Sequence, residues 1–209
     1  MRKVFFDAFK HLEDTRDEPW IMAREPGHYS NFADFALEGL GMGPGQCLVV
    51  GSPLFEVFEL QKNGWDVTYV DVRKPPVLRF NFIQGDASEV VLPKDFDCVS
   101  STCVLCHVGL GRYGDPILEG ADARMMKNIH GALKKGGLAA ICVGTVAAIE
   151  QTVEVGKAWR VWNLDGARAL VKDFKILREK VYSIGTGAWK NGKISKPLND
   201  DYLCFLLKK

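Results

Sequence analysis

The chain has 209 residues, of which 47% are hydrophobic and 25% charged, a composition that excludes a fibrous or disordered protein. Its 27 basic and 26 acidic side chains leave no net field for holding a nucleic acid. Charges interrupt the first residues, and no apolar run is long enough to cross a bilayer. We therefore expect a cytoplasmic protein that acts on a small-molecule substrate away from membranes; composition does not indicate an oligomeric state.

The first 45 residues contain two amphipathic stretches. Residues 4–13 and 31–40 have apolar side chains at helical spacing, and Ser30 is suited to cap the second. Several glycines between residues 39 and 45 then end that helix. We assign residues 1–45 to an N-terminal helical extension or lid and residues 46–209 to the main domain.

After residue 46, short apolar runs alternate with helical segments. Strands buried on both faces are predicted at residues 47–50, 66–72, 80–84, 97–104 and 138–144. This alternation predicts an α/β fold with a doubly wound, mostly parallel, Rossmann-like sheet.

Two helices are clear between these strands. Ser52 can cap a helix over residues 54–63, with Pro53 in its first turn, and a turn at residues 134–137 follows a helix over 122–133. Two later apolar runs, residues 175–184 and 202–207, have no helix between them. They predict an antiparallel hairpin at the edge of the sheet.

The turn after the first predicted strand is a candidate ligand site. In such sheets ligands bind at the carboxyl ends of the strands, and Gly51 lets the backbone approach a ligand closely. Asp71 ends the second strand, where a carboxylate can accept hydrogen bonds from ribose hydroxyls. A bare turn at Gly51 and Ser52, and an aspartate that only caps its own turn, are the structural alternatives. A nicotinamide site is disfavoured because the turn has one glycine and not G-x-G-x-x-G.

Residues 103–107 spell C-x-x-C-H, which is formally a haem-attachment motif or half of a zinc site. No second ligand pair follows at zinc-site spacing, so we predict no metal. The six cysteines lie in apolar, strand-like segments and are interpreted as reduced core thiols. They are Cys47, Cys98, Cys103, Cys106, Cys142 and Cys204.

The segment after the fourth strand carries several polar side chains. His107 can act as a base near neutral pH, or it can hydrogen-bond the loop that follows it. Arg112 can bind an anionic substrate group with two parallel hydrogen bonds, or it can pair with Asp115 to brace the loop. Tyr113 lies between them in the sequence. The loop therefore has more polar side chains than a simple connection between two elements needs.

Residues 109–116 read Gly-Leu-Gly-Arg-Tyr-Gly-Asp-Pro. This run resembles a domain-of-unknown-function family within the class I S-adenosylmethionine-dependent methyltransferase superfamily. The resemblance extends over residues 47–182, through residues 50–52, 134–137 and 159–162. It implies the methyltransferase fold but no established reaction. The family usually has an acidic residue before the histidine, where this chain has Cys106, so a base supported by an acid is disfavoured.

The resemblance implies S-adenosylmethionine as the cofactor, and we assign the candidate residues to parts of one site. Gly51 and Ser52 are assigned to the methionine end, Asp71 to the ribose, and Asp86 with Ala87 to the adenine, and Ser101 is a further predicted cofactor-binding residue. The predicted catalytic residues are His107, Tyr113 and Asp115. The predicted substrate-binding residues are Arg112, Arg160 and Tyr29, the last because N-terminal segments often close over such sites.

Two rival functions stay open at this point. A non-catalytic methyltransferase-like binding domain is favoured by the missing glycines at the first turn. An enzyme that uses NAD or a nucleotide-sugar on the same type of sheet is the other rival, because a sheet fold does not by itself establish a reaction.

Overall fold

The structure, a computed structural model, describes residues 26–75, 79–102, 104–146, 153–155, 159–183, 187–190 and 201–209. For residues 26–30, 145–146 and 153–155 it describes the backbone alone. The helix predicted at residues 4–13 lies outside the described part of the chain.

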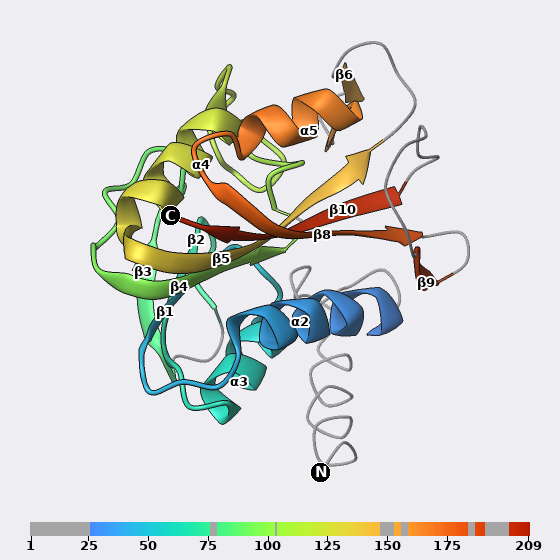
Figure 1. Ribbon diagram of the computed structural model, residues 1–209. Helices are drawn as coiled ribbons and strands as arrows, with labels where there is room; N and C mark the ends of the chain where they lie inside the picture. The colour runs from blue at the N-terminus through green and yellow to red at the C-terminus, as the bar shows by residue number, and fades with distance from the viewer. Residues whose placement is uncertain are drawn as a thin grey trace.

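One eight-stranded sheet forms the centre of the protein, with the strand order β3-β2-β1-β4-β5-β10-β8-β9 (Figure 1). Its strands are β1 (Gln46–Val50), β2 (Asp66–Asp71), β3 (Asn81–Gln84), β4 (Phe96–Thr102), β5 (Leu133–Val146), β8 (Lys175–Ser183), β9 (Ala188–Lys190) and β10 (Asp201–Lys208). The strands β1 to β5 pair in parallel, whereas β10 is antiparallel to both β5 and β8. A separate antiparallel ribbon joins β6 (Val153–Val155) to β7 (Trp159–Val161). The predicted α/β fold with a mostly parallel sheet is therefore confirmed.

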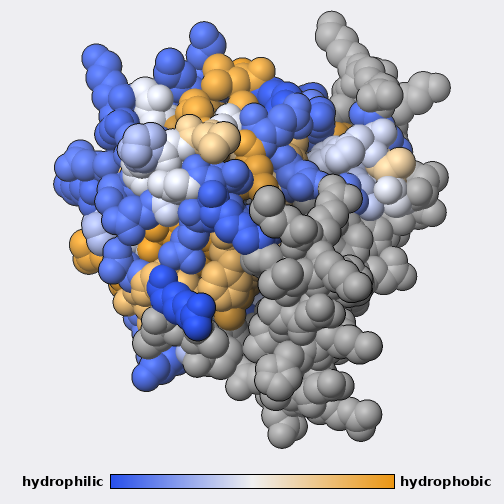
Figure 2. Space-filling model, turned by 90° about the horizontal axis from the view of Figure 1, so that it is seen from below, coloured by the Kyte–Doolittle hydropathy of each residue, from blue (hydrophilic) through white to orange (hydrophobic). Residues whose placement is uncertain are grey.

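Helices cover both faces of the sheet, which makes three layers. The helices α2 (Pro26–Leu40) and α3 (Leu54–Lys62) lie on one face, and α4 (Ala121–Ala132) and α5 (Leu164–Leu170) on the other (Figure 1). Seen from the side of α2 and α3, the surface is mostly hydrophilic with hydrophobic patches between the polar residues (Figure 2). None of the helices in the described ranges combines the length and apolar character needed to cross a membrane.

The antiparallel hairpin predicted from residues 175–184 and 202–207 is confirmed as β8 and β10, and the structure adds the order of its strands. The strand β10 lies between β5 and β8, and β9 forms the sheet edge. Leu203, Cys204 and Phe205 on β10 are all fully buried, which suits a strand covered on both faces. Ile176 and Leu177 on β8 are 40% and 45% exposed, as an outer strand tolerates.

Helix and strand ends also differ from the predicted ones. The helix α2 begins at Pro26, so Ser30 lies inside it and is not its cap; proline is accepted in a first turn because no helical partner is lost there. The predicted turn at residues 134–137 lies within β5 as an irregularity in its pairing with β4. There the backbone of Lys209 bonds to Gly136 and Gly137.

The helix α2 packs directly on the sheet. Phe32 is 1% exposed and contacts Tyr182 on β8 edge to face, at 5.3 Å between ring centroids. Ala36 and Leu40 belong to the core cluster formed with β1 and α3. The boundary at residue 45 stays a prediction.

Candidate functional site

The candidate residues meet along one edge of the sheet because parallel strands end there together. The Gly51 N–H donates to the Val70 carbonyl at 2.8 Å, which joins the ends of β1 and β2. The Gly85 N–H donates to the Asp71 carbonyl at 3.0 Å, which joins β2 to the turn after β3. The Ser101 hydroxyl donates to the Val50 carbonyl at 3.1 Å and joins β4 to β1. We call this row of strand ends the rim.

The turn after β1 is packed against the protein's own side chains. Gly51 has a φ of +60°, and a Cβ added there would lie 2.8 Å from Val104 Cγ1. The close approach predicted for a ligand is thus made by Val104. Ser52 is 1% exposed, and its Oγ accepts a hydrogen bond from the Thr102 N–H at 2.8 Å. The prediction that Ser52 caps α3 is wrong: Pro53 is the N-cap residue, and no side chain caps this helix.

A fully buried carboxyl lies below this turn and was missed by sequence reasoning. Glu56 on α3 accepts hydrogen bonds from the hydroxyls of Thr102, at 2.6 Å, and Ser100. Burial raises the pKa of Glu56 to about 7, although these hydroxyl donors act in the opposite direction. The available signal was spacing: residue 56 follows Ser52 by one helical turn and lies on the buried stripe with Leu60.

Asp71 at the end of β2 is 6% exposed and has four hydrogen-bond donors. Its Oδ1 accepts from the Arg73 backbone N–H at 2.8 Å and from Arg73 Nε at 3.2 Å. Its Oδ2 accepts from the Tyr69 hydroxyl at 2.8 Å and from Arg73 Nη2 at 3.4 Å. Burial and the nearby Asp71 charge raise the pKa of Tyr69, so its hydroxyl stays protonated and donates.

The turn after β3 has a different character. Asp86 Oδ1 accepts from the Ser88 N–H at 2.8 Å. Its Oδ2 is buried and has no hydrogen-bond partner among the residues that the structure describes. Ala87 beside it is 8% exposed, and its carbonyl accepts from Asn128 on α4 at 3.0 Å. A buried carboxylate oxygen of this kind can accept from an amino group of a ligand.

In the loop over residues 109–116, the ring of Tyr113 lies close to two guanidinium groups. The Cζ of Arg73 lies 4.5 Å, and that of Arg112 5.3 Å, from the ring centroid of Tyr113. Arg112 Nη1 lies 3.2 Å from His107 Nδ1. Because a guanidinium only donates, Nδ1 accepts and the imidazole proton is on Nε2. The lone pair that a base would use is therefore engaged in this arrangement.

Asp115 braces this loop from within. Its Oδ2 accepts from the N–H groups of Gly109 and Gly111, at 3.0 and 3.2 Å, and its Oδ1 from that of Tyr113 at 3.0 Å. Asp115 thus braces the loop through backbone N–H groups, whereas the sequence suggested bracing through a pair with Arg112. Its carboxylate supports the positions of Tyr113 and Arg112.

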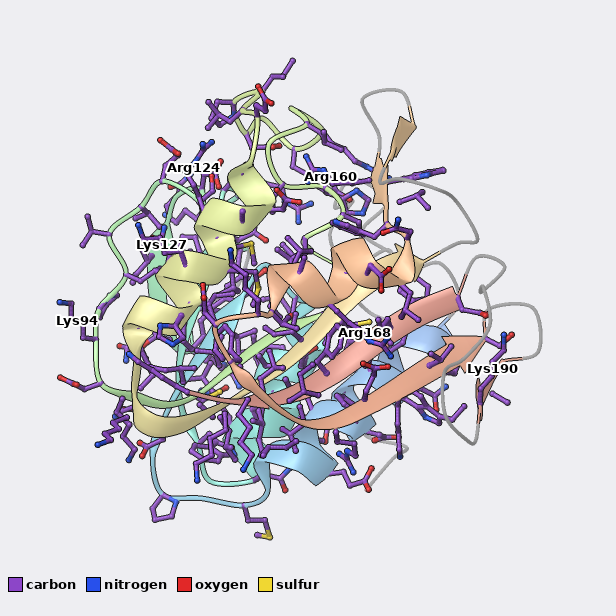
Figure 3. The ribbon with its side chains drawn as sticks, turned by 45° about the horizontal axis from the view of Figure 1, so that its top comes forward. Lys94, Arg124, Lys127, Arg160, Arg168 and Lys190 are labelled. Atoms are coloured by element: carbon purple, nitrogen blue, oxygen red, sulfur yellow. The ribbon has the colours of Figure 1, made fainter. Side chains whose placement is uncertain are left out.

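Arg160 on β7 is 5% exposed and points back to the segment that carries His107 (Figure 3). Its Nη1 donates to the carbonyls of Leu105 and Val108, at 3.4 and 3.3 Å, and lies 3.6 Å from Asp122 Oδ2. These bonds hold the segment at its place beside the rim. Tyr29 lies in α2, but its side chain is outside the described part of the structure.

Of the two cysteines in the motif at residues 103–107, the structure describes Cys106. Cys106 is 6% exposed, and burial raises its pKa to about 12, so it stays a thiol. Cys103 is outside the described residues. Within the described ranges, no group of three or more His, Cys, Asp or Glu side chains is arranged to hold a metal ion.

Comparison with known proteins gives a family match over part of the chain and a set of similar folds. Residues 80–154, less than half of the chain, match the model of a family described as Caenorhabditis protein of unknown function, DUF268. The match includes β3, β4 and the loop over residues 109–116. Among curated proteins, none matches the sequence.

The solved structures that resemble the chain include several methyltransferases. A Burkholderia thailandensis 1,6-didemethyltoxoflavin-N1-methyltransferase, with bound 1,6-didemethyltoxoflavin and S-adenosylhomocysteine, is 18% identical, with a TM-score of 0.67 over 100% of this chain and 86% of its own. The N-methyltransferase NodS from Bradyrhizobium japonicum, in complex with S-adenosylhomocysteine, is 13% identical, with a TM-score of 0.60 over 96% of this chain and 97% of its own. A TehB-like methyltransferase from Corynebacterium glutamicum is 16% identical, with a TM-score of 0.54 over 99% and 97%. At these identities the likeness shows the fold alone, and this fold is that of class I S-adenosylmethionine-dependent methyltransferases.

Proposed function

We propose that this protein binds S-adenosylmethionine at the rim and transfers its methyl group to a small molecule. The observation that carries the proposal is the presence of two acidic residues at the ends of neighbouring strands. Asp71 and Asp86 are brought together by the Gly85 N–H bond to the Asp71 carbonyl. Similar folds that were crystallised with S-adenosylhomocysteine support it.

The residues present fit an adenosine. The buried Oδ2 of Asp86, which has no partner in the described part of the chain, can accept from the adenine amino group, with Ala87 against the ring. The carboxylate of Asp71 can accept from the two ribose hydroxyls once the Arg73 side chain has left it. At the methionine end, Gly51, Ser52 and Ser101 make hydrogen bonds within the protein, so we assign them to the walls of the site.

On the acceptor side, the chain's part is to position the substrate. The bound sulfonium supplies an electrophilic methyl group, so alignment of donor and acceptor is the main requirement. We assign Tyr113, Arg112 and His107 to contact with the acceptor, with Asp115 and Arg160 holding the segments that carry them. Tyr29 is proposed to close over the acceptor from α2.

Isothermal titration with S-adenosylmethionine and S-adenosylhomocysteine tests the proposal. We expect micromolar binding, weakened about 10- to 100-fold by Asp86→Ala, because a hydrogen bond to a charged group is lost. Asp173→Ala, which removes an exposed carboxylate after α5, is the matched control and should leave the affinity unchanged. Absence of heat with both ligands across the titration contradicts the proposal.

A methyltransferase-like binding domain without catalysis is the second candidate. The contact of Val104 with Gly51 and the bonds of Arg73 to Asp71 favour it, because both fill positions assigned to the cofactor. If folded protein shows no binding heat with either S-adenosylmethionine or S-adenosylhomocysteine, this candidate is supported. A thermal shift with NAD(H) but none with S-adenosylhomocysteine would instead favour a nicotinamide enzyme.

A further inference from the structure

Arg73 fills the positions on Asp71 that a ribose needs. Besides its backbone N–H, Arg73 places one side-chain N–H on each carboxylate oxygen, Nε on Oδ1 and Nη2 on Oδ2. Two vicinal hydroxyls would likewise donate one hydrogen bond to each oxygen. Since each oxygen already accepts two hydrogen bonds, a ribose can bind Asp71 only where the Arg73 side chain has left.

The same guanidinium already contacts the acceptor side. Its Cζ lies 4.5 Å from the Tyr113 ring centroid, while Arg112 lies near the same ring at 5.3 Å. The Arg73 side chain is 23% exposed, so a guanidinium that loses its carboxylate there needs another acceptor. The carboxylate of Asp115 in this loop accepts from three backbone N–H groups.

We propose that Arg73 stands in for the ribose hydroxyls until the methyl donor binds, and that the released guanidinium then joins Arg112 in binding an anionic group of the acceptor. This inference rests on the proposed function and adds a substrate class and an order of binding to it. The acceptor is a small molecule with a carboxylate or a phosphate monoester, and it binds after the donor. Arg73 thereby couples the two halves of the site.

The coupling can be measured without knowing the acceptor. S-adenosylhomocysteine is titrated into the full chain alone and with millimolar benzoate, phenyl phosphate or neutral benzamide, at matched ionic strength in phosphate-free buffer. Because coupling between two sites is reciprocal, the anions should tighten S-adenosylhomocysteine binding about 5- to 10-fold, and benzamide should not. The benzoate and phenyl phosphate arms distinguish a carboxylate from a phosphate monoester.

Variants separate the two parts of the proposal. Arg73→Gln should bind S-adenosylhomocysteine severalfold more tightly than the wild type without any anion, because Asp71 no longer accepts from a guanidinium. The variant should also lose the anion effect. Arg112→Gln should also lose the anion effect. Arg79→Gln is the control, because it removes the same charge at an exposed arginine before β3. This variant should keep the anion effect. If Arg73→Gln does not fold, Arg73→Lys replaces it. Lysine retains the charge but cannot donate two parallel hydrogen bonds to one carboxylate.

The outcomes are distinct. Suppose that the wild type binds S-adenosylhomocysteine. If neither anion changes its affinity, or if Arg73→Gln weakens the affinity, the role of Arg73 is overturned and the proposed function stands. Wild-type protein that does not bind S-adenosylhomocysteine overturns both.

Discussion

The turns after β1 and β3 occupy equivalent places at the rim but differ in what they leave for a ligand. After β1, the Gly51 N–H bonds to Val70, Ser52 Oγ bonds to Thr102, and Val104 covers the glycine. After β3, Asp86 keeps one buried carboxylate oxygen without a partner in the described structure. The protein itself thus fills the rim after β1, whereas the turn after β3 keeps a buried acceptor for a ligand.

This difference teaches where binding free energy is available. An unsatisfied buried acceptor gains a full hydrogen bond from a ligand, whereas a satisfied one must first give up its own. We therefore expect adenine to contribute most of the affinity, and the turn after β1 to act mainly as a rigid wall. Variants at Gly51, Glu56 and Asp115 test how the rim and the loop over residues 109–116 are packed.

The largest effect is expected for Gly51→Ala. Its φ of +60° and the 2.8 Å approach to Val104 Cγ1 both oppose a Cβ, so the variant should lose about 2–4 kcal/mol of unfolding free energy. Urea denaturation measures the loss. Adding Val104→Ala should recover the part due to crowding and leave the part due to backbone strain. A Gly51→Ala variant as stable as the wild type would show that this turn is not packed as described.

A smaller effect is expected for Glu56→Gln, and it depends on pH. The pKa of Glu56 is about 7 in the folded protein against 4.5 for an ordinary glutamate, so the folded state holds the proton more tightly. Its contribution to stability is therefore fully present below pH 4.5 and is lost as the pH rises to 7. Between pH 5 and pH 8 the wild type should lose about 2–3 kcal/mol relative to Glu56→Gln.

Urea denaturation at several pH values checks this difference. Glu59→Gln, on the same helix but partly exposed, is the control and should give a curve parallel to the wild type. If the Glu56→Gln curve also runs parallel to that of the wild type, the buried carboxyl does not titrate in this range.

The smallest effect is expected for Asp115→Ala. The variant removes the acceptor of three backbone N–H groups in one loop, so about 1 kcal/mol should be lost, mainly as local opening. Hydrogen exchange should speed up at Gly109, Gly111 and Tyr113, while amides of β4 keep their protection. Unchanged exchange at these three amides would show that Asp115 does not brace the loop.

Much of the fold was predictable because its signals are local. Apolar runs separated by helical segments indicated β1 to β5, and parallel strands place their carboxyl ends on one edge. Gly51, Asp71, Ser101 and Asp86 were therefore found together at the rim as predicted. The ribbon of β6 and β7 and the short β9 were missed, since three-residue strands carry too little pattern.

Other features of the site could not be read from the chain. Arg73 lies two residues after Asp71, a spacing compatible with many partners, and only the folded loop brings Tyr113 to it. The spacing of Glu56 fits the buried stripe of α3, but its residue type argues against burial because glutamate is rarely fully buried. Its burial depends on the Ser100 and Thr102 hydroxyls, which come from a strand more than forty residues away.

The sequence by itself determined the α/β alternation, the parallel half of the sheet and the edge at which candidate residues gather, because periodicity and strand direction are local properties. Tertiary structure decided the insertion of β10 between β5 and β8, the burial of Glu56, and the bonds of Arg73 to Asp71. Each of these depends on which side chains from distant segments meet, and on how much free energy their burial and hydrogen bonding contribute together.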